Sequence, residues 1–208
     1  MHYNDYKKAR NAAWQILIDH KVSELPVRIS SICQADGITI RSYKNAQRVI
    51  SEAGFLSSME SNDGFAVRLN GRDYIFYNDC CSIQRQRFTV AHEYGHFIND
   101  DVSEIPTHRN REPQDNDDPM ETAANVIASR ILAPSCVLWG MKIHKAEDIA
   151  KICDISITSA TWKMKRMELL YQREKEFLLK WGRSCFLQSQ LEMQVYDQFL
   201  SFINKFIN

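Results

Sequence analysis

One short stretch of the sequence carries residue types that could bind a metal ion: His92-Glu93-Tyr94-Gly95-His96. Residues four apart on an α-helix lie on the same face, so the imidazoles of His92 and His96 can reach one point. Two neutral imidazoles suit Zn²⁺, and a neighbouring carboxylate that is not itself a ligand can act on a metal-bound water. Glu93 lies about 100° further around the helix, beside that point. The spacing therefore predicts a hydrolytic zinc site.

The residues around this motif predict a helix over residues 82–98 that faces the core. Small or apolar residues recur through it at helical spacing: Phe88, Ala91, Gly95 and Ile98. Glycine in mid-helix costs about 1 kcal/mol relative to alanine, so Gly95 calls for a packing or functional reason. The alternative interpretation is an ordinary helix, with histidines that are solvated or bonded in the core and a surface glutamate.

A catalytic zinc site needs a third protein ligand and one coordination position for water. A third histidine at the metzincin spacing is absent, because Asn99 and Val102 occupy those positions. The downstream candidates are acidic or imidazole side chains: Glu104, His108, Glu112 and Glu121. We favour Glu121, which heads the apolar stripe of a separate helix predicted over residues 119–132, where an unpaired carboxylate would be costly. Its alternative role is to close a capping box with Asp118.

The clearest β signal in the chain comes directly before the predicted metal-binding helix. Two β-rich runs at 65–69 and 72–77 flank Asn70-Gly71, which predicts a hairpin with a type I′ turn. A strand beside the metal could pair with an extended peptide, or the hairpin could merely cover the helix. Upstream, the pattern predicts a helix at 5–21, a short helix from 25 to 37, a strand at 38–43 and a helix at 44–53.

The region after the motif reads as a long polar loop at 99–119 followed by helices. Residues 146–153 and 158–171 resemble a helix-turn-helix pair, and 184–208 reads as a terminal helix. Three basic residues of this pair are expected to face solvent: Lys163, Lys165 and Arg166. Acidic residues follow them closely, and so short a basic cluster makes few phosphate contacts, so we expect no direct DNA binding. These helices complete the fold, or their outer face helps to hold a protein substrate.

Composition and charge are those of an ordinary globular protein. The hydrophobic fraction is 44% and the charged fraction 25%, and 26 basic residues balance 26 acidic ones. Net charge therefore predicts neither nucleic-acid nor membrane binding. No apolar run approaches transmembrane length, and the N-terminus has no apolar signal core, so we expect a cytoplasmic protein with no membrane partner. The six cysteines form no Cys-x-x-Cys pair and are expected to be free, mostly buried thiols.

Three motifs, in this order along the chain, resemble the ImmA/IrrE family of metallopeptidases: Arg87-Phe88-Thr89-Val90-Ala91-His92-Glu93-Tyr94-Gly95-His96, Glu121-Thr122-Ala123-Ala124-Asn125 and Leu132-Ala133-Pro134. The resemblance is strong over residues 85–134. It is looser up to residue 77 and over 146–170, and it does not cover the C-terminal end. The motif is specific for the zinc site and weak for the identity of the substrate.

The resemblance implies one zinc ion per chain, held by His92, His96 and Glu121, with Glu93 as the general base. It implies an α+β fold, with a zincin-like metallopeptidase domain over residues 1–134 that sets a small β-sheet or hairpin beside the His-Glu-x-x-His helix. A mainly helical C-terminal region over 135–208 follows, with the helix-turn-helix-like pair at about 146–171. Members of the family are typically cytoplasmic proteins of bacteria, phages and mobile elements that cleave helix-turn-helix repressors.

The expected activity is thus that of a zinc metalloendopeptidase of the gluzincin type, with a helix-turn-helix transcriptional repressor as its protein substrate. The candidate donors to the oxyanion, besides the metal, are Tyr77, Tyr94 and His108. The alternative is a non-catalytic regulatory binding protein or a DNA-binding regulator with a structural metal site. Glu93 separates these alternatives, because a purely structural site has no use for that carboxylate.

Overall fold

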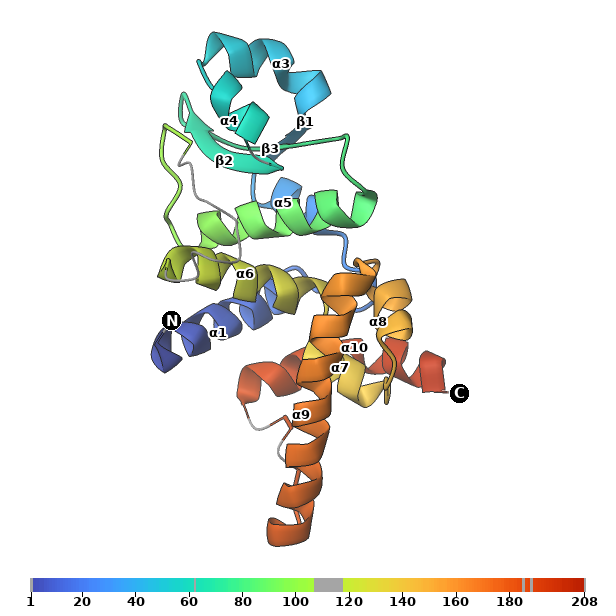
Figure 1. Cartoon of the computed structure of the whole chain (residues 1–208). Helices are drawn as coiled ribbons and strands as arrows, with labels where there is room; N and C mark the ends of the chain where they lie inside the picture. The colour runs from blue at the N-terminus through green and yellow to red at the C-terminus, as the bar shows by residue number, and fades with distance from the viewer. Residues whose placement is uncertain (1, 62, 107–117, 185, 188, 208) are drawn as a thin grey trace. The chain divides into compact units, whose positions relative to one another are not determined.

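The computed structural model describes residues 2–61, 63–106, 118–184, 186–187 and 189–207. It confirms the predicted α+β class, with a small sheet and a mainly helical C-terminal region (Figure 1). The chain forms two compact units, one of residues 1–12 and 28–129 and the other of residues 13–27 and 130–208. Helix α1 (Tyr3–Asp19) begins in the first unit and ends in the second. The boundary at residue 134 stays a prediction.

The first unit contains a three-stranded mixed sheet in the order β1-β3-β2. The antiparallel hairpin of β2 (Gly64–Leu69) and β3 (Arg72–Tyr77) confirms the predicted one. Asn70 and Gly71 both have positive φ, as a type I′ turn requires. Strand β1 (Thr39–Ser42) pairs parallel with β3, a partnership the local sequence pattern does not specify.

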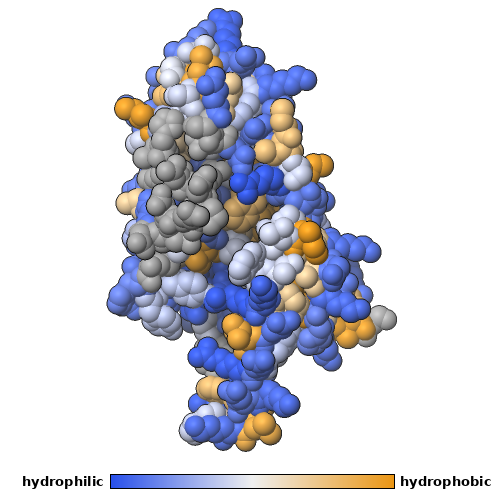
Figure 2. Space-filling view, viewed as in Figure 1, coloured by the Kyte–Doolittle hydropathy of each residue, from blue (hydrophilic) through white to orange (hydrophobic). Residues whose placement is uncertain are grey.

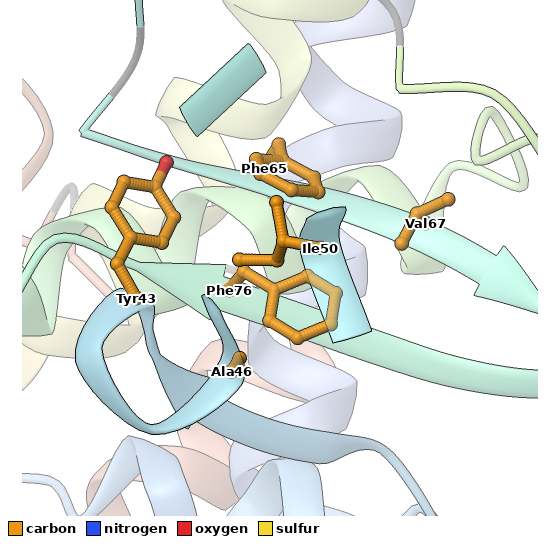
Figure 3. Packing of buried hydrophobic residues seen from close by; sticks show 6 residues of the cluster. All are labelled: Tyr43, Ala46, Ile50, Phe65, Val67 and Phe76. Atoms are coloured by element: carbon orange, nitrogen blue, oxygen red, sulfur yellow. The ribbon is translucent and has the colours of Figure 1, made fainter. Parts of the chain in front are cut away.

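Helices cover the sheet because each strand presents apolar side chains. On one side, α3 (Tyr43–Glu52) packs against β2 and β3 with α4 (Leu56–Ser61) beside it. The resulting cluster is drawn in Figure 3 and consists of Tyr43, Ala46, Ile50, Phe65, Val67 and Phe76. The rings of Phe65 and Phe76 lie 5.2 Å apart across the two strands. This cluster holds the hairpin in a fixed position for the helix that carries the metal motif.

That helix, α5 (Ile83–Ile98), packs against β2 and β3. The approach is close, since a Cβ atom on Gly64 would collide with Thr89 Cγ2 and with the Phe76 carbonyl oxygen. Helix α2 (Ile29–Ala35) also packs against α5. The Tyr94 hydroxyl of α5 donates a 2.5 Å hydrogen bond to Asp36 Oδ2, just beyond α2. Helix α5 is therefore fixed by the sheet and by α2.

The second unit is helical among the residues that the structure describes. It contains α7 (Ser135–Gly140), α8 (Ala146–Cys153), α9 (Ile157–Trp181) and α10 (Gln190–Ile207). Asp154 ends α8 in the left-handed conformation, and the Ser156 hydroxyl caps α9 by accepting from the Ser159 N–H. The side chain of Gln198 donates to the carbonyl oxygens of Leu17 and Val22, which ties α10 to the end of α1.

Two predictions for α9 are wrong. The helix runs ten residues beyond the expected end at 171, to Trp181, and Lys163 does not face solvent. Lys163 is only 8% exposed, and its Nζ donates to Ser135 Oγ at 2.9 Å. A long aliphatic stem lets lysine lie among apolar side chains when its amine finds an acceptor.

The described cysteines are all free, as expected. Cys33, Cys136 and Cys153 are buried, whereas Cys80 is exposed. Burial raises the pKa of both Cys33 and Cys136 to about 12. Residues 119–140 are the one described helical stretch long and apolar enough to cross a membrane, but 67% of its apolar window is buried within the structure, as in a core helix.

Candidate metal centre

The two histidines of α5 point to the same place. The Ser82 hydroxyl caps the helix by accepting from the Arg85 N–H, and His92 and His96 follow one turn apart. They are 2% and 6% exposed. Their Nε2 atoms lie 3.1 Å apart, and their rings are nearly perpendicular at 79°. The predicted convergence of the imidazoles is therefore present in the structure.

Glu121 faces both imidazoles from the first turn of α6 (Pro119–Leu132). Its Oε2 lies 3.2 Å from His92 Nε2 and its Oε1 lies 3.3 Å from His96 Nε2. The start of α6 is capped by Asp118, whose Oδ1 accepts from the Met120 N–H at 2.8 Å. The Glu121 carboxylate is thus directed at the histidines.

Gly95 explains how the two helices come close enough for this. A Cβ atom at Gly95 would lie 2.9 Å from Ala124 Cα, closer than real Cβ atoms approach other atoms, and 3.1 Å from the Ala124 carbonyl oxygen, which is tighter than most such contacts. Only glycine at this position lets the backbone of α6 approach α5 so closely. This is the packing reason that the mid-helix glycine called for.

The Nδ1 nitrogens of both imidazole rings also have hydrogen-bond partners. His92 Nδ1 lies 2.9 Å from Asn125 Oδ1, and His96 Nδ1 lies 2.9 and 3.1 Å from the two carboxylate oxygens of Asp101. An oxygen acceptor at Nδ1 places the proton there and leaves the lone pair on Nε2. Both lone pairs then point at the centre, which is the tautomer that metal binding requires.

Charge and burial compete in this cluster. Burial raises the pKa of Glu121, but the hydrogen bonds from His92 and His96 outweigh it and hold that pKa well below its usual range. Burial lowers the pKa of His96, but Asp101 and Glu121 outweigh it and raise that pKa above its ordinary value. Each contact between a histidine Nε2 and the Glu121 carboxylate is a hydrogen bond only when that nitrogen carries a proton, and a divalent cation would take the place of the proton.

The donor set fits a metal ion. Candidate ligand atoms of His92, His96 and Glu121 all lie within 4.8 Å of one another, and these residues form the one such group among the described residues. Two nitrogens and a carboxylate oxygen are the ligands of a three-residue catalytic zinc site, with one position left for water. Ligand nitrogens at about 2.1 Å from a tetrahedral ion stand about 3.4 Å apart, close to the separation seen here.

The other candidates are placed as follows. Glu104 is exposed and does not join the group, whereas His108 and Glu112 lie outside the described residues. Glu93 is buried on α5 beside His92. Tyr94 is wrong as an oxyanion donor, because it is 1% exposed and its hydroxyl is bonded to Asp36.

Asp101 is the functional candidate that the sequence did not suggest. It follows α5 by three residues, inside the stretch that read as a polar loop. An aspartate five residues after the second histidine, just past the helix end, is the one local signal that could have found it.

A His-Glu-x-x-His helix packed on a small mixed sheet, with a carboxylate from the next helix facing both imidazoles, is the arrangement of a metallopeptidase-type site. The family model of the IrrE N-terminal-like domain, Peptidase_M78, matches residues 33–156, which is more than half of the chain and includes the whole cluster. The chain therefore belongs to this peptidase family, and the resemblance drawn from the motifs is confirmed. No curated protein matches the chain.

Proposed function

We propose that the protein is a zinc-dependent endopeptidase of the gluzincin type that binds one zinc ion per chain through His92 Nε2, His96 Nε2 and the Glu121 carboxylate. The observation that carries the proposal is the convergence of these atoms: the two imidazole nitrogens lie 3.1 Å apart, with the carboxylate oxygens 3.2 and 3.3 Å from them. The family match supports the peptidase activity.

When bound, zinc supplies a Lewis acid that polarises the scissile carbonyl and acidifies the attacking water. The protein supplies the proton transfers. Glu93, buried one residue after His92, takes a proton from the water and later delivers it to the leaving amine. Asn125 and Asp101 hold the imidazoles in the ligating tautomer.

The substrate we propose is a helix-turn-helix transcriptional repressor in the cytoplasm, whose cleavage relieves repression. The support is the resemblance to the ImmA/IrrE family together with the family match. Strand β2, at the edge of the sheet and packed against α5, offers an edge for an extended peptide, although the Arg68 N–H already donates to the Ser103 carbonyl oxygen. Incubation with a repressor encoded beside this chain, with and without a chelator, tests the substrate assignment.

Metal analysis of Glu121→Ala tests the ligand set. We expect the purified variant to lose zinc at micromolar free metal, whereas the exposed Glu104→Ala retains one ion per chain. Retention of zinc at full affinity by Glu121→Ala, with loss in Glu104→Ala or Glu112→Ala, would show that the third ligand is misassigned.

The Glu93→Gln variant tests the general base. The substitution is nearly isosteric and keeps a polar group beside His92, so folding and zinc content should be unchanged. Cleavage should fall at least about a hundredfold, because the proton acceptor is gone. If the variant relieves repression as well as the unmodified protein does, the chain acts by binding alone, and the regulatory alternative replaces the enzymatic one.

A further inference from the structure

Helix α9 exposes a stripe of large apolar and basic side chains that the metal centre does not use. Its opposite face is buried through Ala160, Lys163, Met164, Met167 and Glu174. The outward stripe, called the outer stripe below, consists of Trp162, Arg166, Leu169, Arg173 and Glu176. These residues are spaced by three or four and span about 21 Å of one helix face. Figure 2 shows hydrophobic residues among hydrophilic ones at the C-terminal end of α9, at the bottom of the view.

The apolar members of the stripe are unusually exposed. Trp162 and Leu169 are each 67% exposed, although residues of their size are among those that gain most from burial. Around Leu169 lies a hollow of about 350 Å³, lined by Arg166, Leu169, Leu170, Gln172, Arg173 and Glu176. All six lining residues belong to α9, so the hollow is an open groove along one helix. Such a groove accepts side chains of a second helix and is too open for a small molecule.

The charges around the groove indicate the partner. Lys165, Arg166 and Arg173 are exposed cations on this side of α9, against the exposed carboxylates of Glu168 and Glu176, which leaves a small net positive charge. Lys165 Nζ lies 4.6 Å from the centroid of the Trp162 ring, so the cation adjoins the apolar surface. A complementary surface carries an apolar residue flanked by carboxylates.

Two other possible partners of the outer stripe, the α9 helix of a second copy of the chain and duplex DNA, fit it less well. In an antiparallel pair of α9 helices that buried Leu169 and Leu170 against their copies, Arg166 of each chain would face Arg173 of the other. Duplex DNA would leave Trp162 and Leu169 without an apolar contact and would meet the carboxylate of Glu176.

We propose that the outer stripe of α9 is a docking surface for an acidic amphipathic helix of a protein partner. The partner's apolar residue fills the groove over Leu169 and Leu170, and a partner carboxylate pairs with Arg173. This surface lies within the second unit, on residues that the metal centre does not include, so docking does not require the proposed zinc or Glu93. It would hold a protein partner independently of the active site.

The test measures fluorescence anisotropy of labelled synthetic peptides titrated with the full chain at about 0.1 M salt, with a chelator present. The probe is a helical peptide of about three heptads, with leucine on one face and glutamate on both flanks. One control peptide replaces each glutamate by lysine, and the other replaces each leucine by serine. We expect saturable binding of the acidic amphipathic peptide and at least about tenfold weaker binding of both controls.

Variants locate the binding on the chain. Leu169→Ser and Arg173→Glu should each weaken binding at least about tenfold. Lys175→Glu is the matched control, because Lys175 is an exposed cation on the same helix about 120° from Leu169, and it should change affinity less than about twofold. Circular dichroism and thermal melts check that each variant folds.

Several outcomes would overturn the proposal. They are absence of saturable binding, equal binding of the lysine peptide, and equal losses in Lys175→Glu and Arg173→Glu. Tight duplex-DNA binding abolished by Arg173→Glu would assign the surface to nucleic acid. A concentration-dependent dimer in sedimentation that Leu169→Ser abolishes would assign it to a second copy. Because the chelator removes the metal, none of these results depends on the proposed peptidase activity.

Discussion

The two imidazoles of the candidate centre have partners of different charge. His92 Nδ1 faces the neutral amide oxygen of Asn125, whereas His96 Nδ1 faces the carboxylate of Asp101. Asp100 has φ of 55°, and this left-handed residue turns the chain back so that the Asp101 N–H donates to the His96 carbonyl oxygen at 3.1 Å. Backbone and side chain of Asp101 are thus both hydrogen-bonded to His96.

Substitution of Asp101 should therefore weaken metal binding. We expect Asp101→Ala to lower zinc affinity about 10–100-fold, because His96 Nδ1 loses its acceptor and the ring loses its fixed tautomer. Asp101→Asn, which keeps an oxygen but not the charge, should have a smaller effect. Competition with a chromophoric chelator at constant pH measures both. The neighbouring Asp100→Asn is the control, because Asp100 is exposed and asparagine tolerates the left-handed conformation. Unchanged affinity in Asp101→Ala would remove Asp101 from the site.

A site residue can be predicted from the sequence when its position depends on its own helix, and not when it depends on packing between helices or on a turn. His92, Glu93 and His96 share one helix, so helical periodicity alone predicts which of them face the same way. Glu121 could be chosen only by its place at the head of an apolar stripe and by the family resemblance, because its position depends on how α6 packs. Asp101 was missed because its geometry comes from a turn whose φ the sequence does not reveal. The roles of all five in metal binding and catalysis stay predictions.

Among the secondary-structure elements, the hairpin and the helices with clear caps or apolar stripes could be predicted. Which strands pair and which helices pack together could not. Asn70-Gly71 specifies the turn between β2 and β3 locally, but the parallel pairing of β1 with β3 depends on α3 folding over the sheet. Helices α5 and α6 pack closely against each other at Gly95. This contact sets the distance between the histidines and Glu121.

Gly95→Ala tests that contact. In an isolated helix the substitution would stabilise by about 1 kcal/mol. Here the added methyl would lie 2.9 Å from Ala124 Cα, so we expect a net loss of about 1–3 kcal/mol in the free energy of unfolding, together with weaker zinc binding as α6 is displaced. Urea titration and metal competition measure the two effects. Because the nearest atom is backbone, adding Ala124→Gly should not restore stability. A stabilised single variant would show that α5 and α6 are not closely packed.

Lys163 shows why a charge pattern misled the prediction for α9. The sequence places it among basic neighbours, but its direction on the helix is that of Ala160, Met164 and Met167, so it is buried with them. Burial first, and then the charge of Arg130, lower the pKa of Lys163 well below its ordinary value. Between the folded and the unfolded pKa, the unfolded chain binds the proton that the folded chain releases, so stability rises with pH through that window.

Lys163→Met should consequently stabilise the protein by about 1–4 kcal/mol at neutral pH, because an apolar side chain of similar length replaces a costly buried amine. The gain should shrink as pH rises toward the unfolded lysine pKa of about 10.4, where the amine is neutral in both states. Chemical denaturation at a series of pH values measures it. The exposed Lys175→Met should change stability by less than about 0.5 kcal/mol. A gain that is independent of pH would mean that Lys163 is not titrating in a buried site.

The whole molecule joins segments that are far apart in sequence. Residues 13–27 belong with residues 130–208, and Gln198 of α10 bonds to the Leu17 and Val22 carbonyl oxygens. Sequence periodicity identifies each helix here but not this long-range association, since the partners are separated by more than a hundred residues. The metal centre lies in the unit of residues 1–12 and 28–129, whereas the outer stripe of α9 lies in the other. The candidate metal site and the proposed docking surface therefore consist of separate sets of residues.

Zinc should stabilise one part of the chain selectively. All three proposed ligands lie on α5 and the first turn of α6, so an ion that binds only their folded arrangement stabilises that arrangement by about 4 kcal/mol at a free concentration a thousand times its Kd. We expect amide hydrogen exchange in α5 and at the start of α6 to slow by up to about a thousandfold on adding zinc and to recover with a chelator. Exchange in α9 and α10 should change less than about threefold. Glu121→Ala, measured in parallel, should show no slowing in α5. Equal slowing in α9 and α5 would mean that the two units open together, and no slowing anywhere would show that these residues do not bind the metal.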